Sequence, residues 1–308
     1  MKKILSLFLS IILLCFLTSC QHSILLMTDT QVYDYQTASD EYTHHTNYYS
    51  FQTSPTFSEK TYPKKRSETI ADQSVSLDYY FTKTDIGQSY ETDIYFGNLN
   101  EKLFCQINYH EKSGKITLIE LFDKAITYSE TKLNTEAEFL EFSRTIASKF
   151  MNTEGAITEI HYKSAPPPNV YQASYHGDEY VFIKTLAGYP TMEKVTVSIL
   201  PNGGVQKIEY EAVDQFEDFK ALDDDPDFKT VMEEALEKAR IKTLLQGKGT
   251  YESEKIEYYL INDAGTLLLH YTQTGTYTPN VEEYQQAPYY DQPYTYQKSV
   301  IIPVAELS

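Results

Sequence analysis

Hydrophobic and polar residues alternate along three stretches of the chain, and a short polar turn ending in glycine interrupts each of them. A period of two places successive side chains on opposite faces of a strand. Asn, Asp, Ser and Gly favour the backbone angles of tight turns. The pattern therefore predicts three antiparallel hairpins. The stretches, each with its turn in parentheses, are 103–122 (111–114), 193–211 (201–204) and 255–271 (262–265).

Two other stretches repeat apolar residues every three or four positions, which predicts helices with one buried face. The first helix is expected from about 136 to 151, and Thr135 with Glu138 matches a capping box at its start. The second is expected to begin with Asp225 as the N-cap and Pro226 at the first helical position.

A helix followed by strands occurs twice, so the predicted fold class is α+β. We expect one or two modules of a helix packed on a curved antiparallel β-sheet. One module covers 73–212, with strands at its N-terminal end, and the second helix with its strands covers 226–308. Residues 20–72 are rich in Thr, Ser, Tyr, Gln and His without a sustained apolar period. This composition predicts a flexible, disordered stalk ahead of the modules.

The chain begins with the basic group Met1-Lys2-Lys3 and an apolar run from Ile4 to Phe16, which is too short to span a bilayer. Leu17-Thr18-Ser19-Cys20 follows directly. This segment resembles the lipobox of bacterial lipoproteins. The resemblance implies that residues 1–19 are a signal peptide and that the Cys20 thiol takes a diacylglyceryl group. The alternative is an ordinary signal peptide followed by an unrelated cysteine.

These features predict an extracytoplasmic protein anchored to the cell membrane through the lipid on Cys20, and residue usage favours a Gram-positive source. The formal net charge is −18, and it becomes two units more negative when Lys2 and Lys3 are removed. A charge of this sign argues against nucleic-acid binding and against electrostatic adsorption to anionic membranes. Membrane attachment should therefore depend on the lipid alone.

The chain has three cysteines, Cys15, Cys20 and Cys105. If Cys15 leaves with the signal peptide and Cys20 carries lipid, Cys105 remains alone and the mature protein has no intramolecular disulfide. Cys105 alternates in phase with Leu103, Ile107 and Tyr109. We therefore interpret it as a small buried core residue and not as a nucleophile.

The second hairpin, written Lys194-Val195-Thr196-Val197-Ser198-Ile199-Leu200-Pro201-Asn202-Gly203-Gly204-Val205, follows a helix, and Asn262-Asp263-Ala264-Gly265 repeats its turn. This arrangement resembles the PepSY and YcdB-type domains of secreted bacterial proteins. The resemblance would cover 134–308, and the loops depart from the family pattern. It implies a helix packed on a curved sheet.

No sequence motif for a metal, cofactor or catalytic site is present. The histidines do not form a spaced zinc pattern, and no nucleophile elbow, Walker loop or dinucleotide fingerprint occurs. His161 and His270 fall on strand faces away from the apolar set, so we expect them to be exposed. The acidic run from Asp223 to Asp227 lacks the calcium-loop spacing and is interpreted as charge at a helix N-terminus.

Tyrosine is unusually frequent, with 28 residues and no tryptophan. Tyr offers a large contact area with a polar tip and recurs at binding surfaces. Four tyrosines near the C-terminal end are therefore a possible binding surface, and the alternative is a long hairpin loop with exposed tyrosines. They are Tyr284, Tyr289, Tyr290 and Tyr294.

Taken together, the sequence predicts a membrane-anchored lipoprotein with a non-catalytic binding or inhibitory module, no cofactor, and a protein or cell-wall ligand. The first alternative is a cell-wall glycan or peptide hydrolase, because carboxylates are too abundant for any pair to be selected or excluded. The second alternative is a solute-binding lipoprotein. It is disfavoured because the chain lacks the repeated βα units of two hinged lobes. The ligand and the oligomeric state are left open.

Overall fold

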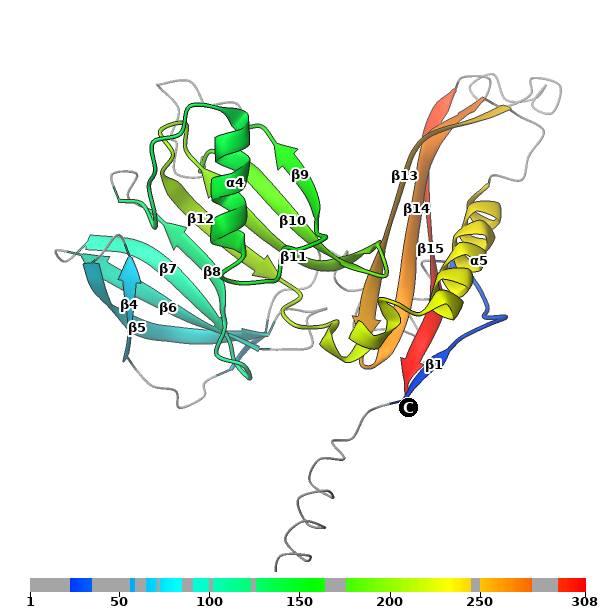
Figure 1. Cartoon of the computed structure of the whole chain (residues 1–308), viewed down its shortest axis with the longest axis horizontal. Coiled ribbons are helices and arrows are strands. Elements are labelled where there is room, and N and C mark those ends of the chain that lie inside the picture. The colour runs from blue at the N-terminus through cyan, green and yellow to red at the C-terminus, as the bar shows by residue number, and fades with distance from the viewer. Residues whose placement is uncertain are drawn as a thin grey trace, which may run out of the picture.

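A computed structural model describes residues 23–34, 56–58, 65–70, 73–84, 91–99, 102–122, 126–163, 176–244, 250–278 and 293–308. Strands dominate these residues (Figure 1). The strands are β1 (Ile24–Leu26), β2 (Tyr33–Asp34), β3 (Thr56–Ser58), β4 (Lys65–Ile70), β5 (Gln73–Thr84), β6 (Glu91–Leu99), β7 (Lys102–His110), β8 (Ile116–Leu121), β9 (Ile157–His161), β10 (Asp178–Leu186), β11 (Tyr189–Ile199), β12 (Val205–Glu211), β13 (Thr250–Asp263), β14 (Thr266–Thr278) and β15 (Tyr294–Leu307). The helices are α4 (Glu136–Ala147), the 3-10 helix η1 (Glu217–Leu222) and α5 (Pro226–Thr243).

Strands β3 to β12 form an antiparallel array, which we call the first sheet. Its spatial order is β5-β6-β7-β8-β12-β11-β10-β9, and both β3 and β4 pair with β5. Helix α4 lies across β10 and β11 (Figure 1). Alternate side chains of β11 point to the helix side, where Val195, Val197 and Ile199 are buried with Ile146 and Ala147 of α4. The period-two pattern of this strand therefore produces one core face.

Strands β13, β14 and β15 form a ribbon that we call the second sheet, and they pair antiparallel over most of their length. Helix α5 packs on one face of this ribbon (Figure 1). Apolar residues from the helix and the three strands form a second buried core there. Its fully buried members include Phe228, Met232, Ala239, Leu260, Leu267, Leu269 and Ile302.

Among the described residues, a single parallel bridge joins the two sheets, and it overturns the predicted fold class. Strand β12 pairs with β11 only as far as Lys194↔Glu211, and beyond that point Thr191 of β11 pairs with Leu260 of β13. All fifteen strands thus belong to one hydrogen-bonded sheet of mixed direction. The prediction of an α+β fold made of helix-on-sheet modules is wrong, because the strands continue from one unit into the other and far outnumber the helices.

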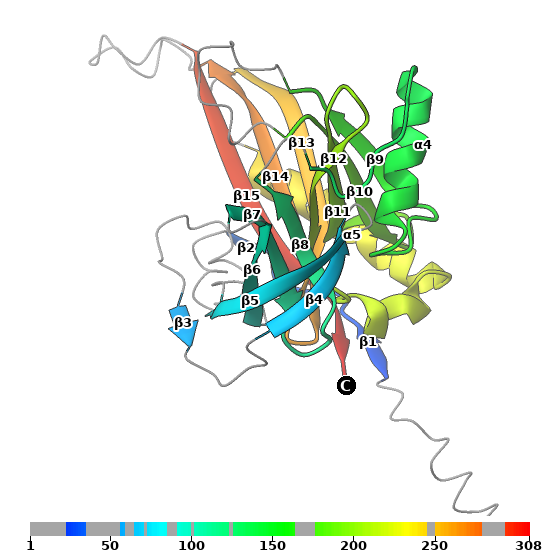
Figure 2. The same cartoon turned by 90° about the vertical axis from the view of Figure 1, so that its left-hand side faces the viewer.

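The predicted flexible stalk needs correction where the structure describes it. Strand β1 pairs with the end of β15, and β4 pairs with β5 over its whole length. In both views β1 lies beside the C-terminus (Figures 1 and 2). The Ser308 N–H donates to the Ser23 carbonyl at 2.9 Å, and the Met27 N–H donates to the Val304 carbonyl at 2.9 Å. Strand β1 is too short to show a period in the sequence, and its pairing with the distant β15 orders it. Strand β4 forms a hairpin with the adjacent β5.

The predicted hairpins and helix starts are confirmed. β7–β8, β11–β12 and β13–β14 are antiparallel pairs around the expected turns. Thr135 and Glu138 form a complete capping box, and the Asp225 carboxylate accepts from the N–H groups of Asp227 and Phe228. Gly203 has a φ of +88°, and a Cβ there would lie 2.0 Å from the Thr131 carbonyl oxygen. Only glycine fits this turn.

The interpretation of Cys105 as a core residue is also confirmed. Its side chain is fully buried beside Ile107 and Tyr109. Burial raises the pKa of the Cys105 thiol to about 11. A thiol that is both buried and protonated at neutral pH is a poor nucleophile.

Several predicted features lie outside the described residues. They are the signal peptide, Cys20, Tyr284, Tyr289 and Tyr290. Tyr294 opens β15, where its backbone is paired opposite Tyr277. In the part of the chain that the structure describes, no helix combines the length and the apolar character that a membrane crossing requires.

Candidate functional site

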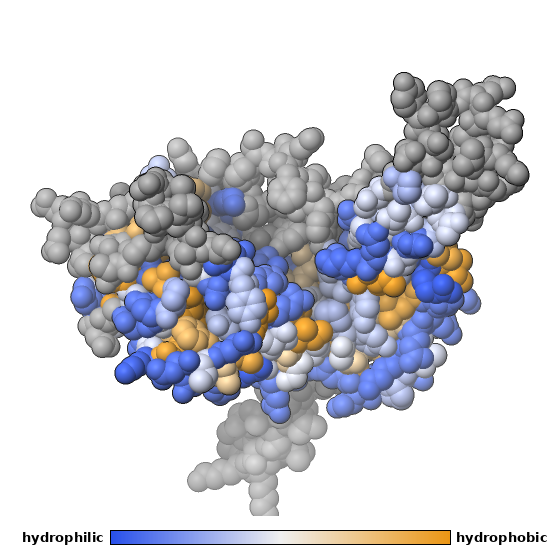
Figure 3. Space-filling model, turned by 90° about the horizontal axis from the view of Figure 1, so that it is seen from above, coloured by the Kyte–Doolittle hydropathy of each residue, from blue (hydrophilic) through white to orange (hydrophobic). Residues whose placement is uncertain are grey.

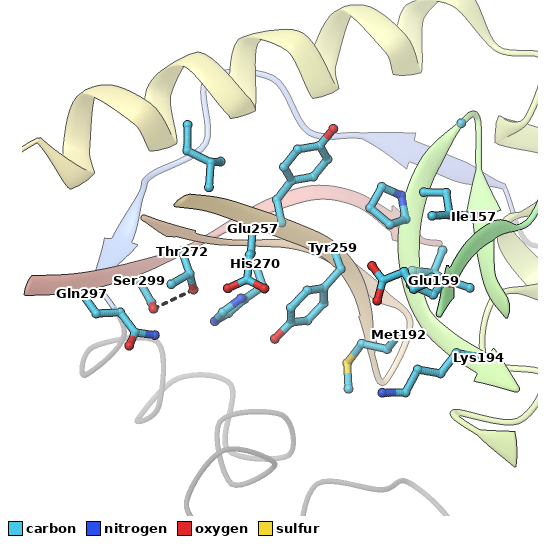
Figure 4. A pocket seen from close by; sticks show the side chains of 16 residues that line it. Ile157, Glu159, Met192, Lys194, Glu257, Tyr259, His270, Thr272, Gln297 and Ser299 are labelled. Atoms are coloured by element: carbon cyan, nitrogen blue, oxygen red, sulfur yellow. Dashed lines mark hydrogen bonds between the residues drawn. The ribbon is translucent and has the colours of Figure 1, made fainter. Parts of the chain in front are cut away.

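A large cleft lies where the two sheets diverge from their common bridge, and its volume is about 1040 Å³. One wall comes from β9, β10 and β11 of the first sheet, and the other from β13, β14 and β15 of the second. Figure 4 shows side chains from both walls directed into this space. Seen from above, apolar residues form separate patches between polar ones on the described surface (Figure 3). Because its walls come from both sheets, the cleft brings together residues that are distant in sequence.

The wall from the second sheet is aromatic and polar. Tyr259 of β13 stacks on His270 of β14, with 4.8 Å between the ring centroids and 24° between the planes. These two residues are opposite each other in the strand register, so the pairing of β13 with β14 sets the contact. Further along the same face, the hydroxyl oxygens of Thr272 and Ser299 lie 2.8 Å apart (Figure 4).

His270 is 5% exposed, so the prediction that it faces solvent is wrong. Burial lowers the pKa of its imidazole to about 4, because a low dielectric disfavours the charged form. His161 fits the prediction better, because about half of its side chain is exposed. The face of β14 that is turned away from α5 is not a solvent face, because the first sheet approaches it.

The wall from the first sheet is mainly apolar with charges at its border. Ile157 of β9 and Met192 of β11 contribute apolar side chains, and Ile157 is 38% exposed. Glu159 and Lys194 lie nearby (Figure 4). The Lys194 ammonium contacts the Glu211 carboxylate at 3.1 Å. A cleft with apolar and aromatic walls and a few fixed polar groups is typical of a ligand-binding site.

A second cavity, of about 500 Å³, lies on the opposite face of the same part of β11, on the α4 side, and contains a charged network. Glu193 is 1% exposed. It accepts from the Tyr210 hydroxyl at 2.7 Å and from the Lys184 ammonium at 3.1 Å. Lys184 also donates to Glu217 at 2.6 Å, and Lys115 pairs with Asp214 at 2.7 Å.

The carboxylates of Glu193, Asp214 and Glu217 lie close enough together to hold a metal ion. However, the Lys184 ammonium already contacts two of them and therefore supplies the positive charge that a metal would bring. Burial raises the pKa of Glu193, and the neighbouring Lys184 opposes that rise. Burial and Glu193 also raise the pKa of Tyr210, so the phenol remains a hydrogen-bond donor. We interpret the cluster as a structural network that fixes the end of β11.

Backbone strain accompanies this network. Ala187, Ala212 and Asp214 have φ values of +52°, +52° and +56°, in the left-handed region that is unfavourable for residues with a Cβ. The Asp223 carboxylate accepts from the Ala187 N–H at 2.8 Å. Asp223 therefore fixes the β10–β11 turn. From the sequence, it was interpreted as part of the acidic charge at a helix N-terminus. The strained turns are held by side-chain contacts from distant residues.

The sequence did not identify either group of residues. One signal was present for Glu193, because it alternates in phase with Val195, Val197 and Ile199 and therefore falls on the core face. The residues of the cleft gave no signal, since their proximity depends on the bridge between β11 and β13. Comparison with known families, curated proteins and solved structures finds no match for this chain. The resemblance to PepSY and YcdB-type domains stays a prediction.

Proposed function

We propose that this protein is a lipid-anchored extracytoplasmic binding protein and that its ligand occupies the cleft between the two sheets. The observation that carries the proposal is the cleft itself, with its volume of about 1040 Å³ and side chains from six strands on its walls. Strands paired over long registers hold both walls, so the site is preformed. A preformed site binds without the entropic cost of ordering loops.

Binding is favoured over hydrolysis by the chemistry of the charged groups. A glycoside hydrolase needs two carboxyl groups that face a substrate from opposite sides. The carboxylates gathered around Glu193 are instead paired with Lys184 and Lys115. In the cleft, Glu257 pairs with Lys255 at 2.7 Å, and Glu159 contacts His161 at 3.2 Å. Each of these cleft carboxylates therefore already has a partner on its own strand.

The anchor and the folded part are close in sequence. Ser23, which bonds to Ser308, follows Cys20 by three residues, and three extended residues span about 10 Å. A lipid on Cys20 would therefore hold the β1–β15 end of the second sheet near the membrane. Tyr294 starts β15 at the opposite end, about 40 Å away along the strand. The ribbon, and not a disordered stalk, would then set the height of the Tyr294 end above the bilayer.

We expect that Cys20→Ala abolishes the incorporation of labelled palmitate into the protein in cells. The protein should then be released or remain uncleaved, because two acyl chains are needed for stable anchoring. Cys15→Ala is the matched control, since it removes a cysteine from the same segment and should leave labelling unchanged. Undiminished labelling of the Cys20 variant would contradict the anchor.

Site-specific photocrosslinking tests the cleft. We expect p-benzoylphenylalanine at Met192 or Gln297, on opposite walls, to give the same covalent adduct in intact cells. The same probe at Glu141 of α4, an exposed position outside the cleft, is the control. Adducts identified by mass spectrometry should be at least about tenfold more abundant from the cleft positions. Equal yields from all three positions, or no adduct, would contradict a ligand site in the cleft.

A further inference from the structure

We propose that the ligand of the cleft is an extended, basic peptide segment that pairs as an added strand with the edge of β13 that the described strands leave open at residues 252–257. This inference rests on the proposed function and specifies its ligand class. An extended peptide satisfies the unpaired backbone groups of a sheet edge, while its alternate side chains enter pockets on the sheet face. The edge, its charge and the chemistry of the wall each support this occupant.

Along residues 252–257, one edge of β13 has no strand partner among the described residues. One side of this strand pairs with β14 from Thr250 to Asp263. On the other side, the described residues provide one partner, Thr191 opposite Leu260. Residues 252–257 are all exposed. An exposed edge strand presents a row of N–H and C=O groups ready to pair with another strand.

This edge borders the cleft directly. Residues 256–259 of β13 line it, and across the space stand Ile157 and Glu159 of β9. Strand β9 is itself an edge, because among the described strands it pairs with β10 alone. A segment lying along β13 would therefore enter a space bounded by a strand edge on either side.

The face of β13 that lines the cleft at Glu257 and Tyr259 carries further carboxylates beyond the cleft. Glu252 is opposite Thr276 and Glu257 is opposite Thr272, on the same face as the pair Tyr259 and His270. Glu254, at the register shift between them, hydrogen-bonds the Thr276 hydroxyl. Lys255 is the cation among these carboxylates and is paired with Glu257. Such charges repel another copy of the same strand and attract a basic one.

The wall also specifies the alternation of the ligand. Successive side chains of an added strand point to opposite faces of the sheet. On the cleft face they would meet Glu252 and Glu257, which favour lysine or arginine. On the opposite face they would meet Ile256 and Tyr258, which favour apolar residues. The expected ligand therefore alternates apolar and basic residues, and an acidic segment of the same length is excluded.

The test uses a synthetic decapeptide of alternating lysine and valine with the purified mature protein. We expect hydrogen-exchange protection of residues 250–259 in its presence, with exchange at least about tenfold slower. A glutamate–valine decapeptide should give no protection. A lysine–valine peptide with N-methylated central residues should also give none, because it keeps the charge but cannot pair as a strand.

Two triple variants separate local recognition from overall charge. Glu252→Lys, Glu254→Lys and Glu257→Lys together should weaken binding of the lysine–valine peptide by at least about tenfold. The matched control reverses three exposed carboxylates outside the cleft, Glu141, Asp224 and Glu234, and should weaken it by less than about threefold. Equal losses in both variants would overturn the edge site and show nonspecific charge attraction.

The outcomes also separate this inference from the function it rests on. If cleft crosslinks form in cells but the lysine–valine peptide leaves β13 unprotected, the cleft binds a ligand of another class and the inference is wrong. If the N-methylated peptide protects β13 as well as the parent peptide, strand addition is wrong. If neither crosslinks nor protection occur, both the cleft function and the added strand are contradicted.

Discussion

Lys184→Met is expected to lower the free energy of unfolding by about 3–5 kcal/mol, the range found when one partner of a buried ion pair is removed. The Glu193 side chain is 1% exposed, and Lys184 is the cation that contacts it. Without that ammonium, the Glu193 charge stays in a low dielectric with only the Tyr210 hydroxyl to stabilise it. Urea denaturation at pH 7 measures the loss.

A second substitution distinguishes an uncompensated charge from lost packing. Adding Glu193→Gln to Lys184→Met removes the charge and keeps an acceptor for Tyr210, so at least half of the lost stability should return. Lys255→Met is the surface control. Its ion pair with Glu257 is more than half exposed on both sides, and exposed pairs contribute less than about 1 kcal/mol. A double variant as unstable as the single one would contradict the electrostatic explanation.

Acidification from pH 7.5 to pH 5 is expected to cost about 2 kcal/mol of stability through His270 alone. Burial lowers the pKa of the folded-state imidazole from 6.5 to about 4. Below pH 6.5 the unfolded chain therefore binds a proton that the folded protein does not bind. This contribution of His270 to the free energy of unfolding is fully present above pH 6.5, and it is lost progressively as the pH falls toward 4.

His270→Gln should remove this part of the pH dependence. Other groups titrate in the same range, so the informative quantity is the difference between the variant and the unchanged protein at each pH. The two curves of unfolding free energy should converge by about 2 kcal/mol between pH 7.5 and pH 5. Parallel curves would show that the imidazole is hydrated in the folded protein and that the cleft wall is open around it.

Local patterns predicted the elements that depend on neighbouring residues. The Thr135–Glu138 capping box and the Asp225 cap were recognised because their partners lie within three positions. The three hairpins were recognised for a similar reason, since a turn residue with positive φ, such as Gly203, is next to the strands that it connects. The burial of Cys105 followed from its phase with Ile107 and Tyr109.

Pairings between distant segments were not predicted, and they decide the site. Strand β1 is three residues long and carries no periodic signal, yet it extends the second sheet by pairing with the end of β15. Glu193 was in phase with the core. However, the compensation of its charge by Lys184 depends on contacts among β10, β11 and η1. The prediction that His270 is exposed was wrong because the first sheet approaches its face.

The sequence by itself determined the hairpins, the helix caps, the acidic charge and the buried thiol, because each depends on residue type and short-range spacing. Only the tertiary structure decided that the strands form one sheet, that part of the expected stalk is folded, and that a cleft separates the two halves. The physical reason is that the bridge between Thr191 and Leu260 connects residues far apart in the chain. Such a pairing follows from the packing of complete faces, which no short segment encodes.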